Sequence, residues 1–370
     1  MKVLVTGAEG FLGWHTRVRF RAVTEHEVIA VDRDEWSDVG TLSRGVDAII
    51  HIAGVNRGSD AEVEQGNIDL AETVAQVAEA SGSAPRIVYA NSVQSGNGTP
   101  YGAGKQRAGE ILAAAAARMG SAYVDVRLPR LFGEHGRPAY NSFVATFVDA
   151  VIRGEEPQIV DNAVSLLHVQ GAAQTLIDGL TTSEARLDPE GVPTTVRGVY
   201  DVLSHFNDLY SRGDIPALTS GLEVDLFNTL RAARFPTHYP IPLEPRSDSR
   251  GSLVEVVRAH GGQGQTFVST TKPGITRGEH YHLRKVERFV VIAGSARISL
   301  RRVLDDSIVS FDVTGDAPVV VDMPTMWVHN ITNTGEGELT TVFWASELFD
   351  PAAPDTFPEN VALSPNPEAG

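Results

Sequence analysis

Residues 2–13 read KVLVTGAEGFLG, a short apolar run followed by three glycines in GxxGxxG spacing. Glycines between a strand and a helix let backbone amides approach a pyrophosphate, whose negative charge the helix N-terminus favours. A tight turn without a ligand is the alternative, but a glycine turn directly after a first strand is typical of a dinucleotide site. The residues predicted to bind the cofactor here are Thr6, Gly7, Gly10, Phe11, Leu12 and Gly13.

The first third of the chain alternates short β-branched runs with helix-like stretches. The runs are residues 28–31, 48–52, 87–89 and 122–127, and the clearest helix candidates are residues 61–81 and 104–119. This alternation is typical of βαβ units, in which each helix returns the chain to a parallel sheet. The fold class predicted for this half is therefore α/β, with a Rossmann-type, doubly wound parallel sheet.

A proline-rich segment separates this half from a different pattern. Residues 235–245 read FPTHYPIPLEP, and four prolines in eleven residues exclude a helix or a central strand. The short alternating runs beyond it predict an all-β sandwich or small barrel. The tail after Asp350 holds five prolines and is expected to lie extended on the surface. The predicted domains are a cofactor-binding domain over residues 1–235, a linker over 236–247 and an all-β domain over 248–370.

Length and composition set the class of protein. A chain of 370 residues is long enough for two domains. Its net charge of -16 repels phosphate backbones and anionic lipid, so neither nucleic acid nor a membrane is an expected partner. The lack of cysteine excludes disulfides and thiolate metal sites. Met1 leads directly into an apolar stretch without the pattern of a signal peptide, so a cytoplasmic location is expected.

The end of the second predicted strand bears on which nicotinamide cofactor is used. Asp32 and Arg33 follow Val31, where the adenosine ribose is expected. An acidic side chain there selects the free 2′-hydroxyl of NAD, whereas a guanidinium pairs with the 2′-phosphate of NADP. The two residues therefore favour opposite cofactors, and the sequence leaves both open.

A tyrosine and a lysine lie four residues apart, which is about one helical turn. Tyr101 and Lys105 therefore share one face of a helix, and Ser92 ends the strand before it. A phenol with a pKa of about 10 is a poor acid at neutral pH, but a nearby ammonium and the positive charge of an oxidised nicotinamide favour the phenolate. Tyr101 is thus predicted to exchange a proton with a substrate oxygen that Ser92 holds, with Lys105 in support.

Together these residues resemble the extended short-chain dehydrogenase/reductases that act on nucleotide sugars. The resemblance covers roughly residues 1–235. It places the HIAG sequence of residues 51–54 beside the cofactor, which adds His51, Ala53 and Gly54 to the implied cofactor-binding residues.

A second motif lies in the all-β half. Residues 274–294 match every position of the first cupin motif, G(x)5HxH(x)4E(x)6G, with His280, His282 and Glu287 at its polar positions. Alternation places the two histidines on one face of a strand, and Glu287 can reach that face from the next strand. A later stretch resembles the second cupin motif and adds His329. Three imidazoles and a carboxylate suit Zn, Mn, Fe or Ni, so a metal site is predicted.

The same stretch allows another interpretation. Residues 277–281, RGEHY, resemble an element of cupin-type deoxysugar epimerases, in which the histidine matching His280 is a base and no metal is bound. His280 is therefore either a metal ligand or a free base. The presence of His282, Glu287 and His329 favours the ligand, which leaves the base unassigned. Lys272, Tyr281 and Lys285 are the nearby candidates for the base.

The order of the two halves resembles one family nearly end to end, the bifunctional capsule-biosynthesis enzymes of the CapF type. The resemblance implies a cupin that epimerises C3 of UDP-2-acetamido-2,6-dideoxy-4-hexulose and a reductase that then reduces C4 with NADPH, toward UDP-N-acetyl-L-fucosamine. It also implies zinc in the cupin and a homodimer. Two other hypotheses stay open: a reductase whose metal serves stability or dimerisation, and a sugar-nucleotide-binding protein without turnover.

Overall fold

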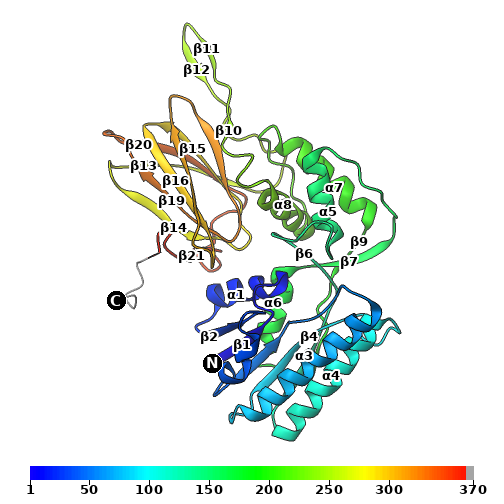
Figure 1. Ribbon diagram of the computed structural model, residues 1–370. Coiled ribbons are helices and arrows are strands. Elements are labelled where there is room, and N and C mark those ends of the chain that lie inside the picture. The colour runs from blue at the N-terminus through cyan, green and yellow to red at the C-terminus, as the bar shows by residue number, and fades with distance from the viewer. Residues whose placement is uncertain (364–370) are drawn as a thin grey trace. The chain divides into compact units, whose positions relative to one another are not determined.

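A computed structural model describes residues 1–363 of the chain (Figure 1). The chain divides into two compact units, each made of segments that are distant in sequence. The first unit contains Met1–Phe132 and Asn162–Thr195, and the second contains Gly133–Asp161 and the chain from Val196 onward. Within the described residues, no helix combines the length and the apolar character that crossing a bilayer requires.

The first unit is a doubly wound parallel sheet of six strands. Its order is β2-β1-β3-β4-β5-β8, and every neighbouring pair is parallel. The order reverses direction between β1 and β3, which is the position where such sheets bind nucleotides. The strands are β1 (Lys2–Thr6), β2 (Glu27–Val31), β3 (Ala48–His51), β4 (Arg86–Ser92), β5 (Tyr123–Leu128) and β8 (Arg186–Leu187). A smaller sheet joins β6 (Arg130–Phe132), β7 (Ala163–His168) and β9 (Val192–Thr195).

Helices cover both faces of this sheet. Ile50 of β3 packs with α1 (Phe11–Val23) and α6 (Val169–Asp178), whereas its neighbour Ile49 packs with α3 (Asp60–Ala80) and α4 (Pro100–Met119). Successive residues of a strand point to opposite faces, so a sheet buried on both sides needs uninterrupted apolar runs. A short 3-10 turn (Trp36–Asp38) and α2 (Val39–Leu42) connect β2 to β3.

The start of α4 decides where the predicted catalytic pair lies. The helix begins at Pro100, four residues before the predicted start, because Thr99 accepts a hydrogen bond from Gly102 N–H and proline fits the first helical turn. Gly120, with φ of +67°, ends it. Tyr101 and Lys105 are consequently both helical and one turn apart.

As far as the structure describes it, to residue 363, the second unit contains two five-stranded antiparallel sheets and three helices. The sheet orders are β10-β18-β15-β20-β13 and β17-β16-β19-β14-β21, an arrangement consistent with a cupin-like domain. The first sheet contains β10 (Ile241–Pro242), β13 (Gln265–Thr271), β15 (Glu287–Ala293), β18 (Val319–Met323) and β20 (Leu339–Ala345). The second contains β14 (Thr276–Tyr281), β16 (Ser295–Arg302), β17 (Ile308–Thr314), β19 (Trp327–Asn333) and β21 (Phe357–Pro358). The remaining elements are α5 (Phe143–Arg153), α7 (Val196–Tyr210), α8 (Gly221–Arg234) and the hairpin β11 (Arg246–Asp248) with β12 (Gly251–Leu253).

Buried charged groups join the helices of the second unit to its sheets. Arg288 of β15 is 1% exposed and donates to both carboxylate oxygens of Asp322, at 2.8 and 2.9 Å. Tyr210 of α7 donates to the same carboxylate at 2.6 Å. Arg231 of α8 donates to the carbonyl oxygen of Met323 at 2.5 Å. Each buried charge therefore has a partner, which burial in a low dielectric requires.

This division differs from the predicted domain boundaries. Residues 133–161 and 196–235, predicted as part of the cofactor-binding domain, group with the antiparallel sheets. The predicted linker is packed rather than free, because Tyr239 is buried and β10 pairs with β18. The predicted domain boundaries at residues 235 and 248 divide the chain by sequence pattern, whereas the compact units divide it by contacts. These boundaries therefore stay a prediction.

The tail after Asp350 does not simply lie on the surface. β21 pairs with β14, and Val361 is 2% exposed. The expectation of a surface tail is wrong for residues 355–357, 359 and 361, which are partly or fully buried and held by residues 70 or more positions earlier in the chain. The last two of the five prolines lie outside the described residues.

Candidate active site and metal centre

The glycine turn is compact because three backbone segments meet there. A methyl group on Gly13 would lie 2.0 Å from the carbonyl oxygen of Gly7, and one on Gly7 would lie 2.8 Å from the nitrogen of Ala53. Gly7 also has φ of +67°, which side chains disfavour. The hydroxyl of Thr6 accepts hydrogen bonds from Ile52 and Ala53 N–H, both at 3.2 Å. The turn is thereby held against the segment that follows β3.

The N-terminus of α1 leaves its first amides available for an anion. Gly10 is the N-cap and has no side chain to accept from them, and the first turn holds no acidic residue. Phe11 and Leu12 are partly buried, and Leu12 packs against the core beneath the sheet. The backbone of this turn thus suits a pyrophosphate, whose charge the helix dipole favours.

The residues after β3 contribute backbone rather than side chains. The ring of His51 is 1% exposed, bonds to the Thr6 hydroxyl at 2.8 Å and stacks on Tyr89. Burial, with a contribution from the charge of Lys105, lowers the pKa of His51 to about 3. Gly54 lies where a side chain would meet Asn67 Oδ1 at 3.0 Å. The cofactor contact predicted for His51 can therefore come from its backbone, while its buried imidazole holds the hydroxyl of Thr6.

Arg33 lies where the sequence predicted, just beyond the carboxyl end of β2. Its side chain is exposed, and Asp32 next to it is half-buried. The amide of Asp32 donates to Glu35 at 3.1 Å, which orders this turn. Because the Arg33 guanidinium is already exposed, it can reach a phosphate without any movement of the residues around it.

The structure brings the predicted catalytic side chains together at the carboxyl edge of the sheet. Ser92 ends β4, and its hydroxyl lies near enough to the phenol of Tyr101 to influence its pKa. Lys105 is buried and donates to the carbonyl oxygen of Ala90 at 2.7 Å, with its ammonium 4.2 Å above the ring of Tyr89. Ser92 and Tyr101 are thus placed where both can reach one substrate oxygen, as proton transfer to that oxygen needs.

Burial decides the protonation of this pair. Burial raises the pKa of Tyr101, and the hydrogen bond from Ser92 opposes that rise. Burial also lowers the pKa of Lys105 to about 7, although the carboxylate of Asp125 opposes this. The expected stabilisation of the phenolate depends on the cofactor's charge as well as on Lys105, so it stays a prediction, and without that charge burial governs the Tyr101 pKa. Tyr101 is a neutral phenol here, the form that donates a proton.

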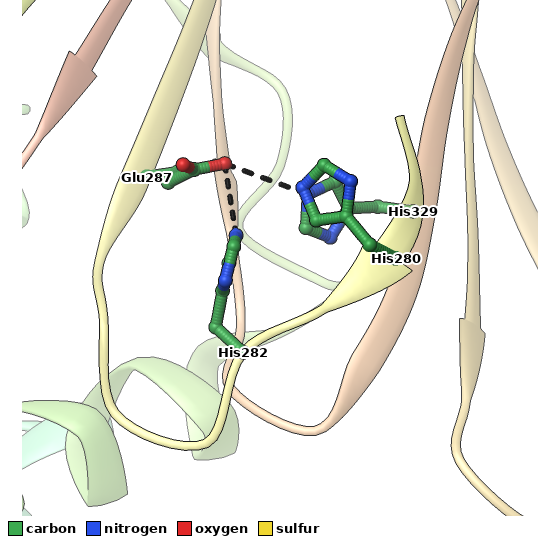
Figure 2. A group of neighbouring side chains, drawn as sticks. All are labelled: His280, His282, Glu287 and His329. Carbon is green, nitrogen blue, oxygen red and sulfur yellow. Dashed lines mark ion pairs between the residues drawn. The ribbon is translucent and has the colours of Figure 1, made fainter. Parts of the chain in front are cut away.

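Four side chains from two facing sheets form the second candidate site (Figure 2). His280 and His329 belong to neighbouring strands β14 and β19, His282 directly follows β14, and Glu287 begins β15 in the other sheet. One ligand atom from each of the four lies within 4.8 Å of the others. Nε2 of His282 and of His329 lie 3.0 and 3.5 Å from Oε2 of Glu287. Ligands about 2.1 Å from a tetrahedral ion are separated by similar distances.

A bulge sets the direction of His280. The register of β14 against β19 shifts between Gly278 and His280, so that His280 pairs with His329. Gly278 has φ of +99°, and a methyl group there would lie 2.7 Å from the carbonyl oxygen of His329. Bulges of this kind re-aim a side chain toward a site.

The hydrogen bonds of the two buried histidines show that the residues fit a cation. Nδ1 of His282 donates to the carbonyl oxygen of Asp355 at 2.5 Å, and Nδ1 of His329 donates to that of Trp327 at 3.1 Å. A carbonyl oxygen only accepts, so both rings carry hydrogen on Nδ1 and present Nε2 to Glu287. A neutral Nε2 and a carboxylate are both acceptors. A cation between them, a proton on Nε2 or a metal ion, resolves this contact, and the donor set suits zinc or a similar dication.

The charges around the cluster agree with this assignment. Although burial opposes it, His282 and His329 hold the pKa of Glu287 well below its ordinary value, so the carboxylate is ionised. Burial and the two other imidazoles lower the pKa of His280 to about 3. Burial lowers the pKa of His329 as well. Neutral imidazoles with an ionised carboxylate are the ligand forms that bind a dication.

A cavity of about 210 Å³ reaches this cluster. Lys285 and Glu287 lie among its lining residues, with Phe267 and Phe349 nearer the solvent. Of the three candidate bases, Lys285 lines this cavity, Lys272 is exposed, and Tyr281 is 1% exposed. The sequence missed the role of Asp355, whose carbonyl orients His282 from 73 residues away. No motif spans that separation, so no local signal could have found it.

Comparison with known proteins identifies the family. The chain matches the NAD dependent epimerase/dehydratase family over residues 3–185 and the polysaccharide biosynthesis C-terminal domain over residues 246–357. It is 32% identical, over 96% of its length and 98% of the relative, to UDP-2-acetamido-2,6-beta-L-arabino-hexul-4-ose reductase of Pseudomonas aeruginosa. The crystal structure of capsular polysaccharide assembling protein CapF from Staphylococcus aureus matches with TM-score 0.63 and 33% identity, over 98% of this chain and 100% of that one. The chain belongs to the CapF family.

More distant structures support the fold of one half of this CapF-family chain. UDP-glucose 4-epimerase from Thermotoga maritima matches 63% of the chain and 99% of its own length, with TM-score 0.55 and 16% identity. At that identity the likeness extends to the fold alone. The CapF-type resemblance inferred from the sequence, and the pairing of a Rossmann-type sheet with a cupin-like domain, are thus confirmed.

Proposed function

We propose that this protein is an NADPH-dependent nucleotide-sugar reductase whose second unit first epimerises the substrate. The substrate would be UDP-2-acetamido-2,6-dideoxy-4-hexulose, inverted at C3 and then reduced at C4 toward UDP-N-acetyl-L-fucosamine. The relative from P. aeruginosa, similar along nearly the whole chain, is named as a reductase of a UDP-linked hexul-4-ose. The observation that carries the proposal is the placement of Tyr101 and Lys105 one turn apart at the start of α4, with Ser92 nearby at the carboxyl end of β4.

Reduction of a ketone needs a hydride on carbon and a proton on oxygen. Bound NADPH supplies the hydride. Ser92 holds the carbonyl oxygen, and Tyr101, a neutral phenol with a raised pKa, donates the proton. Lys105 lies one helical turn away, where its charge can stabilise the phenolate left behind. The glycine turn, the N-terminus of α1 and Arg33 would hold the cofactor's phosphates.

Epimerisation needs removal and return of the proton on C3, which the neighbouring 4-ketone makes acidic. His280, His282, Glu287 and His329 would hold the metal, which supplies Lewis-acid polarisation of a carbonyl oxygen when bound. Lys285 is the one of the three candidates that lines the cavity reaching the cluster; as an ammonium paired with Glu287 it can return a proton to C3, and the base that removes the C3 proton stays unassigned. We extend the proposal to zinc as the metal and a homodimer as the assembly, which metal analysis and sedimentation test.

A second function is favoured by the burial of the cluster. His282 and His329 are 1% and 0% exposed, and four protein ligands are typical of closed, structural metal sites. In that case the protein is a nucleotide-sugar 4-ketoreductase whose metal stabilises the second unit. The cavity beside Glu287 favours the catalytic alternative.

One experiment tests both candidates. The purified protein is incubated with the UDP-4-keto sugar in D2O, with and without NADPH, while NADPH oxidation and deuterium at C3 are followed. We expect Tyr101→Phe to lose reduction by a factor of about 10² to 10⁴ and to keep C3 exchange. Reduction at full rate in Tyr101→Phe refutes the reductase site, and lack of C3 exchange refutes the epimerase. Tyr200→Phe, which removes a hydroxyl from α7, is the matched control.

A further inference from the structure

Residues 354–361, here named the C-terminal strap, contact the loop that connects two of the metal-ligand candidates. The carboxylate of Asp355 accepts three consecutive backbone hydrogen bonds, from Leu283 at 3.0 Å, Arg284 at 2.9 Å and Lys285 at 2.7 Å. This loop starts at His282 and ends at Glu287. One side chain of the strap therefore fixes the backbone between two residues of the cluster.

The same residue also orients an imidazole. The carbonyl oxygen of Asp355 accepts from Nδ1 of His282 at 2.5 Å, which places hydrogen on Nδ1 and leaves Nε2 facing Glu287. Asp355 has φ of +40°, an uncommon conformation for a residue with a side chain. That conformation lets one residue present both its carboxylate and its carbonyl to one loop.

A second contact connects the strap to the carboxylate ligand. The ammonium of Lys285 is 3.3 Å from Oε1 of Glu287, and it donates to Thr356 Oγ1 at 3.2 Å and to the carbonyl oxygen of Pro354 at 3.5 Å. Lys285 is 9% exposed, so these contacts are shielded from solvent. Glu287 thus has one oxygen toward the histidines and the other toward a lysine that the strap holds.

The far end of the strap is anchored in the barrel. Arg301 is 1% exposed and donates to the carbonyl oxygens of Asn360 and Val361, both at 2.9 Å, and to Glu359 Oε1 at 2.7 Å. Between the two ends, Phe357 pairs with Tyr281 of β14. The strap is therefore tied on both sides of the contact with the His282–Glu287 loop.

We infer that the C-terminal strap sets the geometry of the metal centre, with Asp355 as its positioning residue. Asp355 does not touch the ion. It selects the nitrogen that His282 presents and fixes the turn that brings His282 and Glu287 together. Partners of this kind around metal ligands typically change metal affinity about 10–100-fold when removed. The inference rests on the proposed metal centre.

The test measures zinc affinity in the full-length protein by competition with a chelator. Asp355→Asn keeps the carbonyl but places an amide N–H₂ where an oxygen accepts from N–H groups, so we expect zinc to bind about 10–100-fold more weakly. Asp306→Asn, in the exposed turn between β16 and β17, should bind zinc like the wild type. Cobalt in place of zinc gives a second readout, because its absorption spectrum should change in Asp355→Asn and not in the control.

The outcomes separate this inference from the proposed metal centre. If the wild type binds no zinc, the metal centre itself fails and the inference falls with it. A second outcome is that the wild type binds zinc while Asp355→Asn binds it equally well and differs only in a lower unfolding temperature. In that case the strap stabilises the fold without setting the metal geometry, and the inference is overturned. If Asp355→Asn does not fold without metal, Asp355→Ser replaces it in the test. Its hydroxyl can still accept one hydrogen bond, so we expect zinc to bind more weakly than to the wild type, by less than the loss expected for Asp355→Asn. Wild-type zinc affinity in Asp355→Ser would overturn the inference.

Discussion

The two candidate sites are built from different parts of the polypeptide. In the parallel-sheet unit, a dinucleotide would meet backbone N–H groups at the glycine turn and the start of α1. In the β-rich unit, four side chains converge within 4.8 Å. The two sites differ because their ligands differ. A pyrophosphate needs hydrogen-bond donors, and backbone N–H groups supply them whatever the side chain. A dication needs several lone pairs at one point, and here three imidazole nitrogens and one carboxylate oxygen supply them.

The two units also treat buried charge differently. The parallel-sheet unit shifts its buried bases toward neutrality, since burial lowers the pKa of His51 to about 3 and that of Lys105 to about 7. The β-rich unit also neutralises a buried base, since the pKa of His280 falls to about 3, but it keeps other buried charges by pairing them, as in Arg288 with Asp322. Such a pair depends on both of its members, whereas Lys105 can respond to pH as a single buried group.

The largest effect should come from breaking a buried pair. Asp322→Ala leaves the Arg288 guanidinium buried without its carboxylate, and we expect a loss of about 3–5 kcal/mol in the free energy of unfolding, measured by denaturant titration. Asp312→Ala removes the partner of exposed Arg297 at the same 2.8 Å and should change the free energy of unfolding far less, because solvent screens this pair. The double change Arg288→Met with Asp322→Leu should recover most of the loss. Equal losses for Asp322→Ala and Asp312→Ala would show that burial adds nothing to the cost of breaking the Arg288–Asp322 pair.

The next effect concerns the site built from backbone. Gly13→Ala places a methyl group 2.0 Å from the Gly7 carbonyl oxygen, so the turn must open at a cost of about 3 kcal/mol. NADPH affinity, measured by fluorescence titration, should fall about 100-fold or more. Gly40→Ala is the control, because its methyl group would meet Val77 at an ordinary 3.8 Å. Wild-type affinity in Gly13→Ala would contradict a site made of closely packed backbone.

The pH dependence of stability tests the lone buried base. The pKa of Lys105 is about 7 when folded and about 10.5 when unfolded, so between these values the unfolded chain binds more protons. Its contribution to stability should therefore rise with pH, by on the order of 1–3 kcal/mol from pH 7 to pH 9, and stay constant below pH 7. Lys105→Met should remove this slope, and Lys272→Met, an exposed control, should keep it. An unchanged slope in Lys105→Met would mean that Lys105 is charged when buried.

The smallest effect concerns cofactor choice. Arg33→Ala removes an exposed cation beside the expected 2′-phosphate and should raise KM for NADPH about 10-fold, with little change for NADH or in kcat. Arg44→Ala, also exposed, is the control. If Asp32→Ala instead raises KM for NADH and Arg33→Ala changes neither, the enzyme prefers NAD.

The prediction of the fold succeeded where the signal is local. The β-branched runs predicted β2, β3, β4 and β5 to within a few residues, because a sheet covered on both faces needs consecutive apolar residues. The motif spacing likewise anticipated that His280, His282, Glu287 and His329 would converge, although alternation alone did not show the bulge that aims His280. The rise that burial causes in the Tyr101 pKa could not be read from a four-residue spacing, and the expected effect of Lys105 and the cofactor's charge on that pKa stays a prediction.

The sequence by itself determined the glycine turn, the Tyr101–Lys105 helix face and the histidine spacing, since each depends on neighbours within a turn or a strand. Tertiary structure alone decided that residues 133–161 and 196–235 group with the antiparallel sheets, and that Asp355 holds His282. The physical reason is that these outcomes depend on which buried polar groups find partners across long stretches of chain. Such pairing leaves no periodic trace in the sequence, because one carboxylate or one carbonyl is enough to make it.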